Sequence, residues 1–468
     1  MNGMQGREPM ARLHGSKILR TGIHGVDRYL RGVKHRLKQI PLVQAAVPPR
    51  PVKVRTGFED LNAFLAEIRR KLEVTDAQQQ LVGLSEVYFK FDSSELERLH
   101  PFGEAYRAKV LEFYRNVTGN SHYDPMEMEK TNAADNLQDD FCPIPYRFQN
   151  SELVGEHLSC YGAVLQRLNV RAGADILEYG PGEGQLCINL ARMGCNVHAV
   201  DIESRFLRLI EKQCEALGIN ISTRQARFGE GFDGKQFDRI IFFEAFHHCF
   251  DHYNVLMRIR DQLKPDGFIC FSGEPVIPEG SPDSILVPYP WGLRLDGEAM
   301  RSIHEFGWME LGYSEPYFLE LLARCGYSVE RNRHPMHPRA DIYIARRITN
   351  RYPIERDTVI STYTGQSGWH ATEGGHRWTD GDAWMPLPVN GYSTVSVALH
   401  NMSPRPVEVQ ISCATDAQKL NLPSGGEARV QLTVSSWPSN LRIRSGTFQP
   451  GLGDPRTLGV AVRAIEFS

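Results

Sequence analysis

Residues 176–185 constrain the fold of this chain more than any other segment. They read Ile-Leu-Glu-Tyr-Gly-Pro-Gly-Glu-Gly-Gln, so an apolar run ends at Glu178 and then breaks into alternating glycines. Apolar residues resume at helical spacing after Gln185, which predicts a strand, a tight turn and the start of a helix. Glycine permits positive φ angles and has no Cβ, so a ligand can approach the backbone of this turn closely. The helix start would offer it free N–H groups.

The spacing of the glycines separates two classes of nucleotide-like ligand. A dinucleotide-binding turn, G-x-G-x-x-G, would need glycine at position 185, where Gln185 stands. The pattern E-x-G-x-G-x-G instead resembles motif I of the class I S-adenosylmethionine-dependent methyltransferases. That resemblance implies that Glu178 helps to hold the amino-acid end of the cofactor, with Gly180 and Gly182 lining it. The competing interpretation is a glycine-rich turn that binds no ligand.

The following segments continue the resemblance. Residues 196–201 read as a strand that ends in Asp201, about 20 residues beyond the glycine turn, where a carboxylate can accept both ribose hydroxyls. Residues 263–271 resemble the "LKPGG" turn and fifth strand of the same family. Strands near 219–223, 238–243, 327–331 and 341–347 alternate with helices near 203–217 and 314–324. This alternation predicts an α/β fold with a Rossmann-like, seven-stranded sheet covered on both faces.

One segment departs from the family. Residues 223–228 lack the acidic residue that usually contacts the adenine, and either Gln225 or Phe228 could replace it. The resemblance implies the following cofactor-binding residues: Glu178, Tyr179, Gly180, Pro181, Gly182, Gly184, Gln185, Asp201, Ile202, Gln225, Phe228 and Glu244.

The segment after the fourth strand, residues 243–252, is expected to face the reaction site, because ligands bind beyond the carboxyl ends of such strands. It reads Phe-Glu-Ala-Phe-His-His-Cys-Phe-Asp-His and resembles the "LHHVxD" stretch of many small-molecule methyltransferases. A hydroxyl acceptor needs a nearby base, and histidine suits this role at neutral pH. His247 is the first candidate and His248 the second, with Glu244 or Asp251 orienting an imidazole. A buried structural hydrogen bond is the competing role for one histidine.

A metal interpretation of the same region is also open. His247, His248, Asp251, His252 and Glu274 carry suitable ligand atoms. Their spacing along the chain matches no dedicated metal motif, so no metal is expected.

A long insert rich in proline, glycine and aromatic residues follows the fifth strand. Residues 273–278 and 287–296 are expected to form a lid that shapes an acceptor site, although a lid that packs on itself is the alternative. The predicted substrate-binding residues, including two upstream of the glycine turn, are Tyr146, Arg147, Glu274, Tyr289, Trp291 and Arg294. His304, Trp308 and Glu310 complete the aromatic and charged set of the insert.

The chain divides into four predicted regions: a basic arm (1–55), a helical cap or acceptor region (56–170), the methyltransferase-like domain (171–348) and a β-sandwich (349–468). The arm is expected to be a mobile segment or a solvated helix that docks on the rest of the protein, and attachment to an anionic membrane surface is the alternative. The C-terminal region has short β-favouring stretches between turn residues. Residues 368–378 and 454–462 resemble β-sandwich modules of bacterial surface-polysaccharide enzymes. Trp369, Trp378 and Trp384 suit sugar stacking or, equally, core packing.

Composition adds limits. A length of 468 residues predicts roughly two to four domains. Nine cysteines without a C-x-x-C pair predict reduced thiols and a cytoplasmic location. The chain has neither a run of about 18 apolar residues nor an apolar signal core. The basic residues gather in the arm and no N-P-P-Y-type tetrapeptide follows the fourth strand, so a nucleic-acid substrate is not expected.

These features predict an S-adenosylmethionine-dependent methyltransferase that O-methylates a sugar of a bacterial surface polysaccharide or its precursor, with a histidine base. Two alternatives remain: O-, N- or C-methylation of a small non-sugar metabolite, and a non-catalytic glycan-binding scaffold with a vestigial cofactor domain. The sequence leaves open the identity of the acceptor. It also leaves open the oligomeric state, and a homo-oligomer is one of the possible states.

Overall fold

The computed structural model describes residues 53–74, 84–130, 143–335, 337–364, 367–389, 392–436, 438–451 and 453–468. The chain divides into two compact units, Met1–Pro49 and Arg50–Ser468, and only the second contains described residues. All but the last three residues of the predicted basic arm lie outside the described ranges. Both interpretations of that arm therefore stay predictions.

The region before the glycine turn is mainly helical, as predicted. Its longest elements are α2 (Gly57–Val74), α5 (Glu104–Thr118) and α7 (Ser151–Leu168). Helix α5 buries one apolar stripe that runs from Tyr106 to Val117, and it ends at Gly119, whose positive φ closes the last turn. The shorter elements of this region are β1 (Lys53–Thr56), η1 (Leu84–Glu86), β2 (Val87–Lys90), α4 (Ser94–Glu97), α6 (Pro125–Met128) and η3 (Tyr146–Phe148).

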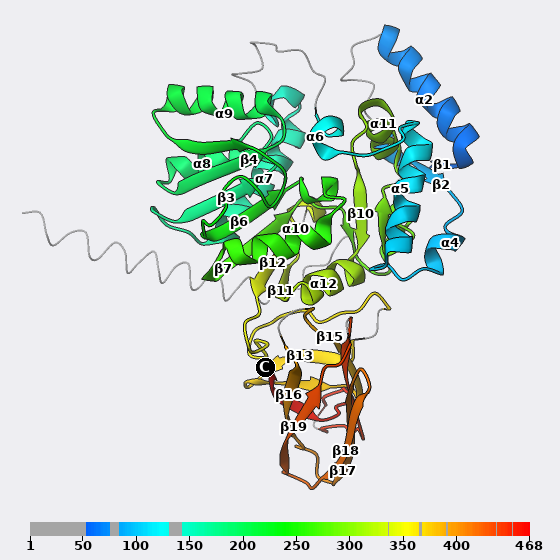
Figure 1. The fold of residues 1–468 in the computed structure, drawn as a ribbon, viewed down its shortest axis with the longest axis vertical. Helices are drawn as coiled ribbons and strands as arrows, with labels where there is room; N and C mark the ends of the chain where they lie inside the picture. The colour runs from blue at the N-terminus through cyan, green and yellow to red at the C-terminus, as the bar shows by residue number, and fades with distance from the viewer. Residues whose placement is uncertain are drawn as a thin grey trace, which may run out of the picture. The chain divides into compact units, whose positions relative to one another are not determined.

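Strands between residues 175 and 347 form a seven-stranded sheet (Figure 1), with the strand order β11-β12-β7-β6-β3-β4-β5. Five strands are parallel, and β12 and β11 are antiparallel to their neighbours. The chain leaves β3 toward β4 and β5 and then returns to β6 on the other side of β3, which makes β3 a switch point of the topology. The strands are β3 (Asp175–Tyr179), β4 (Asn196–Asp201), β5 (Ile221–Gln225), β6 (Phe237–Phe243), β7 (Leu263–Ser272), β11 (Tyr327–Asn332) and β12 (Ile342–Arg347).

Helices bury both faces of this sheet. Alternation along β3 sends Leu177 and Tyr179 into one core and Ile176 into another. The core of Ile176 includes residues of α7 and α8, and the core of Leu177 includes residues of α10 and α12. The sheet's helices are α8 (Gln185–Arg192), α9 (Ser204–Leu217), α10 (His252–Ile259) and α12 (Glu315–Arg324), with η4 (Phe246–His248) and η5 (Arg260–Gln262) before and after α10.

The insert between β7 and α12 is an ordered subdomain. Its strands β8 (Val276–Ile277), β9 (Trp291–Leu293) and β10 (Leu311–Ser314) form a small sheet in the order β8-β10-β9. Helix α11 (Gly297–Phe306) packs against α5, and η6 (Pro282–Leu286) precedes β9. The predicted lid therefore packs on the helical N-terminal region through its own core.

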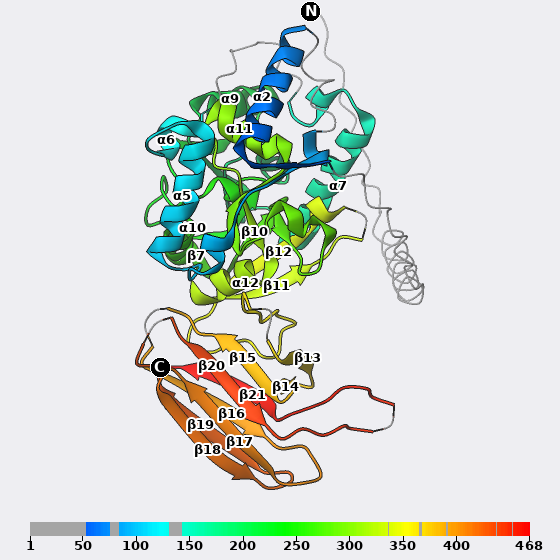
Figure 2. The ribbon, with the colours of Figure 1, turned by 90° about the vertical axis from the view of Figure 1, so that its right-hand side faces the viewer.

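The C-terminal region is made of β-strands, as predicted, and they form two antiparallel sheets (Figure 2). Alternate residues of β16 and β17, such as Val397 and Ile411, enter one shared core. The first sheet contains β13 (Trp369–Glu373), β14 (His376–Thr379), β21 (Ala461–Phe467), β16 (Thr394–His400) and β19 (Glu427–Thr433). The second contains β15 (Asp382–Pro386), β20 (Asn440–Ser445), β17 (Val407–Cys413) and β18 (Asp416–Leu422). The resemblance of the C-terminal region to modules of polysaccharide enzymes stays a prediction.

A buried ion pair on α12 connects the central and C-terminal regions. Glu320 Oε1 accepts a hydrogen bond of 2.8 Å from Arg324 Nε, and Glu320 Oε2 accepts one of 2.7 Å from the backbone of Tyr363. Arg324 also donates to Ser439 O and Asn440 Oδ1 of the C-terminal region. Both charged side chains are almost fully buried, so this contact fixes the junction of the two regions.

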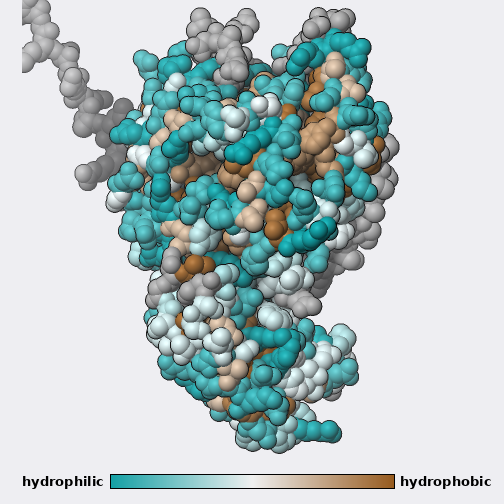
Figure 3. Space-filling view, turned by 45° about the vertical axis from the view of Figure 1, so that its right-hand side comes forward, coloured by the Kyte–Doolittle hydropathy of each residue, from teal (hydrophilic) through white to brown (hydrophobic). Residues whose placement is uncertain are grey.

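The described surface is mostly polar. On the face shown in Figure 3, hydrophilic residues predominate and hydrophobic ones lie between them in small groups. The exposed large apolar side chains among the described residues are Val54, Phe58, Ile144, Tyr146, Leu153, Leu158, Met193 and Leu217. Among the helices of the described ranges, none combines the length and the apolar character needed to cross a membrane.

Candidate active site

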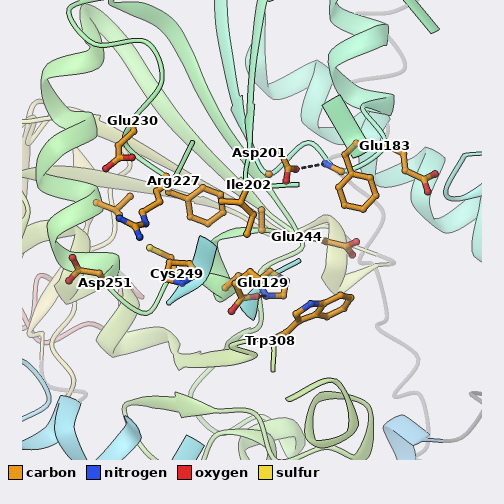
Figure 4. A pocket seen from close by; sticks show the side chains of 18 of the residues that line it. Glu129, Glu183, Asp201, Ile202, Arg227, Glu230, Glu244, Cys249, Asp251 and Trp308 are labelled. Atoms are coloured by element: carbon orange, nitrogen blue, oxygen red, sulfur yellow. Dashed lines mark hydrogen bonds and ion pairs between the residues drawn. The ribbon is translucent and has the colours of Figure 1, made fainter. Parts of the chain in front are cut away.

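A cavity of about 560 Å³ lies at the carboxyl ends of β3, β4 and β6 (Figure 4). Its wall combines the glycine turn, the ends of these strands, helix α10 and segments of the helical region and the insert. The lining residues are Pro125, Glu129, Ile144, Arg147, Gly180, Gly182, Glu183, Asp201, Ile202, Arg205, Phe206, Arg227, Phe228, Glu230, Glu244, Ala245, His248, Cys249, Asp251, Asn254, Val255, Arg258 and Trp308.

The three glycines of the turn have positive φ angles for different reasons. A Cβ on Gly180 would lie 2.7 Å from Ala245 Cβ, and one on Gly184 would lie 2.4 Å from Ile210 Cγ1. A Cβ on Gly182 would have no atom within 4 Å. Gly180 and Gly184 are therefore required by packing, whereas Gly182 presents bare backbone to the cavity. This open concave backbone fits a nucleoside-type ligand.

Asp201 lies at the end of β4 beside the turn. Its Oδ2 accepts a 3.3 Å hydrogen bond from Gly182 N, drawn in Figure 4, and its Oδ1 accepts one of 2.8 Å from Glu203 N. Burial raises the pKa of Asp201 to about 6, although the backbone donors oppose this shift. The structure thus places this predicted ribose-binding carboxylate on the cavity wall, next to the backbone of the turn.

Two residues of the predicted cofactor set lie behind the turn and do not line the cavity. Glu178 Oε2 accepts a hydrogen bond from Cys187 Sγ at 2.8 Å, and burial raises the pKa of Glu178 to about 7. The Tyr179 ring stacks on Phe242, and its hydroxyl donates to Gln262 Oε1 over 2.8 Å. The predicted direct contacts are corrected accordingly: these side chains support the turn from the core side.

Glu183 lines the cavity instead, and the sequence analysis did not single it out. Arg147 Nη2 lies 2.6 Å from Glu183 Oε1, and Ile144 N donates to Glu183 Oε2 over 2.5 Å. Arg147 lines the cavity, so its predicted contact with the substrate stays a prediction, whereas Tyr146 is exposed and outside the lining. The signal that could have found Glu183 is its place between two glycines of the turn.

Residues 223–228, which lack an acidic residue for the adenine, place only one of the two candidate adenine contacts at the cavity. Ile202 and Phe228 line the cavity. Gln225 does not, because its amide donates to Ile202 O over 3.0 Å on the exposed side. Of the two open candidates, Phe228 is the one at the cavity. Three other predicted residues, Pro181, Gly184 and Gln185, also lie outside the lining, and the Gln185 amide donates to Gln213 Oε1 at 3.3 Å.

The two predicted catalytic histidines lie on η4 and face different surroundings. His247 is outside the cavity lining: its Nδ1 is 2.9 Å from Glu274 Oε2 and its Nε2 is 3.7 Å from Glu310 Oε2. His248 lines the cavity, and its Nδ1 lies 3.2 Å from Glu129 Oε2. Burial opposes the charge of His248, but the Glu129 carboxylate prevails and raises the pKa of His248 to about 9.

Glu244, the third predicted catalytic residue, has a φ of 51°, which is uncommon for a residue with a side chain. A Cβ on the neighbouring Gly273 would lie 2.3 Å from Glu244 Cγ, so that glycine makes room for it. Glu244 lines the cavity, and its Oε1 lies 3.0 Å from Arg339 Nε. Glu244 therefore lies at the cavity in which the cofactor is expected. Its carboxylate is paired with Arg339, which was not among the predicted site residues.

The remaining predicted acceptor residues are corrected by the structure to roles outside the cavity lining. Glu274 is buried beneath η4. Trp291 is 1% exposed and donates to Pro101 O, and Tyr289 is also buried. Arg294 lies within 3.0 Å of Asp296 Oδ2. Sequence composition cannot show which face of an insert is buried, and here these side chains form the core of the insert.

Two lining residues on the acceptor side come from segments far from the strand ends. Glu129 follows α6, where it accepts from the Tyr123 hydroxyl at 2.8 Å and from Met309 N at 2.6 Å. Trp308 precedes β10, and its indole lies near His248 with ring centroids 6.1 Å apart. Trp308 belonged to the predicted aromatic set of the insert, but no local pattern distinguished Glu129.

The C-terminal tryptophans divide between two settings. Trp378 is buried, and its indole donates to Glu373 Oε2 over 3.1 Å. Trp369 and Trp384 line a second cavity of about 520 Å³ together with His370, Asp380 and Asp382. Core packing therefore describes Trp378, and the sugar-stacking interpretation is retained for the other two.

Comparison with known proteins agrees with the geometry of the first cavity. Residues 177–271 match the family described as "Methyltransferase domain". A ubiquinone biosynthesis O-methyltransferase of Actinobacillus pleuropneumoniae serotype 7 is 29% identical over 115 residues, which cover 23% of this chain and 49% of that protein. A demethylmenaquinone methyltransferase of Tropheryma whipplei is 30% identical over 105 residues, which cover 22% and 44%. The chain thus spans about half the length of the curated relatives that it matches.

Among solved structures, the chain is similar to 1,6-didemethyltoxoflavin-N1-methyltransferase of Burkholderia thailandensis, crystallised with 1,6-didemethyltoxoflavin and S-adenosylhomocysteine. The identity is 19%, the TM-score is 0.32, and the match covers 47% of this chain and 94% of that one. The family match covers the glycine turn, Asp201 and η4, which are the elements that build the cavity wall. Residues 177–271 are thus similar to a methyltransferase domain.

Proposed function

We propose that this chain is an S-adenosylmethionine-dependent methyltransferase that methylates a hydroxyl group of a small acceptor, a sugar of a bacterial surface polysaccharide or its precursor. One observation carries the proposal: the bare backbone of Gly182 and the carboxylate of Asp201 share a single cavity with His248 and Trp308. A donor held at the glycine turn and an acceptor held at the histidine would therefore meet in one enclosed space.

The residues of the glycine turn fit the cofactor. Gly182 offers unobstructed backbone, Asp201 offers a carboxylate for the ribose hydroxyls, and the Phe228 ring offers a surface for the adenine. When bound, S-adenosylmethionine supplies an electrophilic methyl group on a sulfonium. The contribution of the chain is to align the acceptor oxygen with that methyl group and to exclude water from the cavity.

The proton-handling role falls to His248 rather than to His247, the first candidate of the sequence analysis. His248 lines the cavity, whereas His247 does not. Glu129 behind His248 raises the pKa of this imidazole to about 9, so only its deprotonated fraction, which grows as the pH rises toward 9, can accept the proton that leaves the acceptor hydroxyl. Glu244 lies at the same cavity, and we assign it a role at the cofactor because Arg339 occupies its carboxylate.

A sugar is proposed as the acceptor because the described lining around His248 mixes charged and aromatic side chains. Glu129, Asp251 and Arg227 can accept from or donate to hydroxyl groups, while Trp308 provides a flat surface for a pyranose ring. The second cavity, with Trp369 and Trp384, suits the same chemistry. It gives the C-terminal region a role in holding a longer glycan.

A second candidate is an aromatic hydroxyl acceptor. The curated relatives are named for the biosynthesis of ubiquinone and for demethylmenaquinone. A quinol-like ring could lie on Trp308 and present its hydroxyl to His248 as a sugar would. The third candidate of the sequence analysis, a glycan-binding scaffold, requires no cofactor binding at all.

The test has two stages. Calorimetry first measures the binding of S-adenosylmethionine to the unmodified chain and to the Asp201→Asn variant. An enzyme should bind the cofactor, and the substitution should weaken that binding at least ten-fold. A scaffold need not bind the cofactor. Methyl-labelled cofactor is then offered with sugar acceptors and with catechol- or quinol-type acceptors. Label in sugar products supports the proposal, and label only in aromatic products rejects the sugar in favour of the second candidate. Absence of cofactor binding rejects both enzyme functions.

A further inference from the structure

Three side chains converge on one point at the edge of the main cavity: His247, His248 and Glu310. Each offers one ligand atom, and these atoms all lie within 4.8 Å of one another. The closest measured pair is His247 Nε2 and Glu310 Oε2, 3.7 Å apart. Atoms that bind one metal ion at about 2.1 Å lie roughly 3–3.5 Å from each other, so small side-chain rotations would complete the geometry.

Both imidazoles are oriented from behind by a carboxylate. His247 Nδ1 lies 2.9 Å from Glu274 Oε2, and His248 Nδ1 lies 3.2 Å from Glu129 Oε2. Histidines that bind metals generally donate their second ring N–H to such a group, which fixes the tautomer and leaves Nε2 with its lone pair. His247 has this hydrogen bond, whereas Nδ1 of the adjacent His248 lies at ion-pair distance from Glu129 without hydrogen-bond geometry.

The supporting carboxylates are themselves held in place. Glu129 Oε1 accepts from the Tyr123 hydroxyl and from Met309 N. Glu274 Oε1 accepts from the two backbone N–H groups that precede His247. A fixed outer layer of this kind reduces the entropy that the imidazoles would lose on binding an ion.

Charge around the cluster favours a cation. The carboxylates of Glu129, Glu274 and Glu310 are all about nine-tenths buried or more. Arg294 lies 3.8 Å from Glu310, but Asp296 already pairs with this guanidinium at 3.0 Å. Buried carboxylates need compensating positive charge, which a protonated His248 supplies in the ligand-free protein and which a divalent ion at the two imidazoles would supply in its place.

We propose that His247, His248 and Glu310 form a binding site for a divalent transition-metal ion such as Zn²⁺. Two imidazoles and one carboxylate suit borderline metals, and three protein ligands leave a coordination position open. Because His248 lines the main cavity, that open position faces the space in which an acceptor would bind. This inference rests on the proposed function, and it changes one role there: a metal-bound His248 could not accept a proton, so the ion would instead lower the pKa of the acceptor hydroxyl, and the proton would leave to solvent.

Spacing along the chain does not predict this metal site. Glu310 lies in the insert, at the start of β10, far along the sequence from the two histidines. Only the packing of the insert on the central sheet brings the third ligand to them.

The experiment measures metal binding without cofactor or acceptor. Chain lacking any histidine tag is treated with a chelator, dialysed and titrated with Co²⁺, followed by visible absorption, and Zn²⁺ is then added as competitor. We expect one equivalent of tightly bound Co²⁺ with the spectrum of a low-coordinate site, displaced by Zn²⁺. His248→Asn and Glu310→Gln should each weaken binding at least 100-fold, and Glu129→Gln should weaken it about 10- to 100-fold.

His122→Ala is the matched control, because His122 is an exposed histidine that also pairs with a carboxylate, Glu127 Oε2 at 3.1 Å. It should bind Co²⁺ as the unmodified chain does. Thermal unfolding identifies any variant that does not fold, and Glu310→Gln, which keeps the shape of the side chain, then decides the result. The inference is overturned if the unmodified chain binds no stoichiometric metal, or if folded Glu310→Gln and His248→Asn retain its affinity. Cofactor binding measured separately shows whether the proposed function survives that outcome.

Discussion

Glu274 holds His247 at two points. The backbone N–H of His247 donates to Glu274 Oε2 over 3.0 Å, and the Nδ1 atom of the same residue lies 2.9 Å from that oxygen. The other carboxylate oxygen accepts the N–H groups of Ala245 and Phe246. Burial by itself would raise the pKa of Glu274, but the imidazole and the backbone donors outweigh it, and the net direction is downward. The turn that presents both histidines is thus built on one charged side chain.

Replacing Glu274 with Gln should destabilise this turn. The neutral amide cannot match four charge-assisted contacts, so we expect a loss of about 2–3 kcal/mol in the free energy of unfolding. Chemical denaturation of the two proteins measures this difference. Glu279→Gln is the control, because Glu279 is an exposed carboxylate in the same insert. Equal stability of Glu274→Gln and the control would contradict the structural role given to Glu274.

Two alanine substitutions in the glycine turn should have opposite consequences. Gly182→Ala places a methyl group in open space at the cavity, so it should cost only about 1 kcal/mol of backbone strain yet weaken cofactor binding at least ten-fold. Gly184→Ala drives a methyl group against Ile210 and should cost about 2–4 kcal/mol in stability. Thermal unfolding and cofactor calorimetry on both variants test the contrast. If Gly182→Ala binds the cofactor as tightly as the unmodified chain does, the backbone of Gly182 does not line the cofactor site.

The stability of the ligand-free protein should depend on Glu178. Burial raises the pKa of Glu178 from 4.5 to about 7, so its contribution to stability is fully present below pH 4.5 and is lost as the pH rises through 7. Glu178→Gln stays neutral throughout. The stability of the unmodified chain relative to this variant should therefore fall between pH 4.5 and about 7 and should level off above pH 7, where the carboxyl is ionised in both the folded and the unfolded state. Denaturation curves of both proteins at matched pH give the difference, and a pH-independent difference would disagree with the buried neutral carboxyl.

The junction between the central and C-terminal regions should depend on the Glu320–Arg324 pair. Glu320→Ala leaves a buried, uncompensated guanidinium and should cost about 3–5 kcal/mol, whereas replacing both residues with apolar side chains should restore much of this loss. The matched control is the pair Arg351 and Glu355, which has the same i,i+4 spacing but has about half of each side chain exposed. Glu355→Ala should change stability by less than about 0.5 kcal/mol.

Chemical denaturation supplies these values, and limited proteolysis of residues 349–364 reports on the junction itself. Faster cleavage in Glu320→Ala than in the control is expected. Equal cleavage rates would show that other contacts hold the two regions together.

Trp308 should determine acceptor affinity without affecting the cofactor. It lines the cavity with its ring 6.1 Å from that of His248, and Figure 4 shows it apart from Asp201. Trp308→Ala should raise KM for the acceptor about ten-fold, because ring stacking is worth roughly 1–2 kcal/mol. Calorimetry should give unchanged affinity for S-adenosylmethionine, and Trp308→Phe should recover most of the acceptor affinity. A parallel loss of cofactor affinity would place Trp308 on the donor side instead.

The sequence predicted the strands and the glycine turn well because these depend on local rules. Strand and helix periodicities are written in consecutive residues, and a glycine pattern reports directly on backbone angles. The same rules could not rank residues inside the insert. Trp291 and Tyr289 have the composition of a binding site, yet they pack in the core, because burial depends on which element covers a given face.

The sequence by itself determined the α/β architecture, the C-terminal β-strands and the place of the cofactor turn, since each is encoded in residues close together along the chain. Only the tertiary structure decided which histidine faces the cavity, that Glu129 and Trp308 join it, and that Glu310 meets His247. The physical reason is that a site of this kind is assembled from loops at the ends of different elements. Their side chains become neighbours only when the hydrophobic cores beneath them pack.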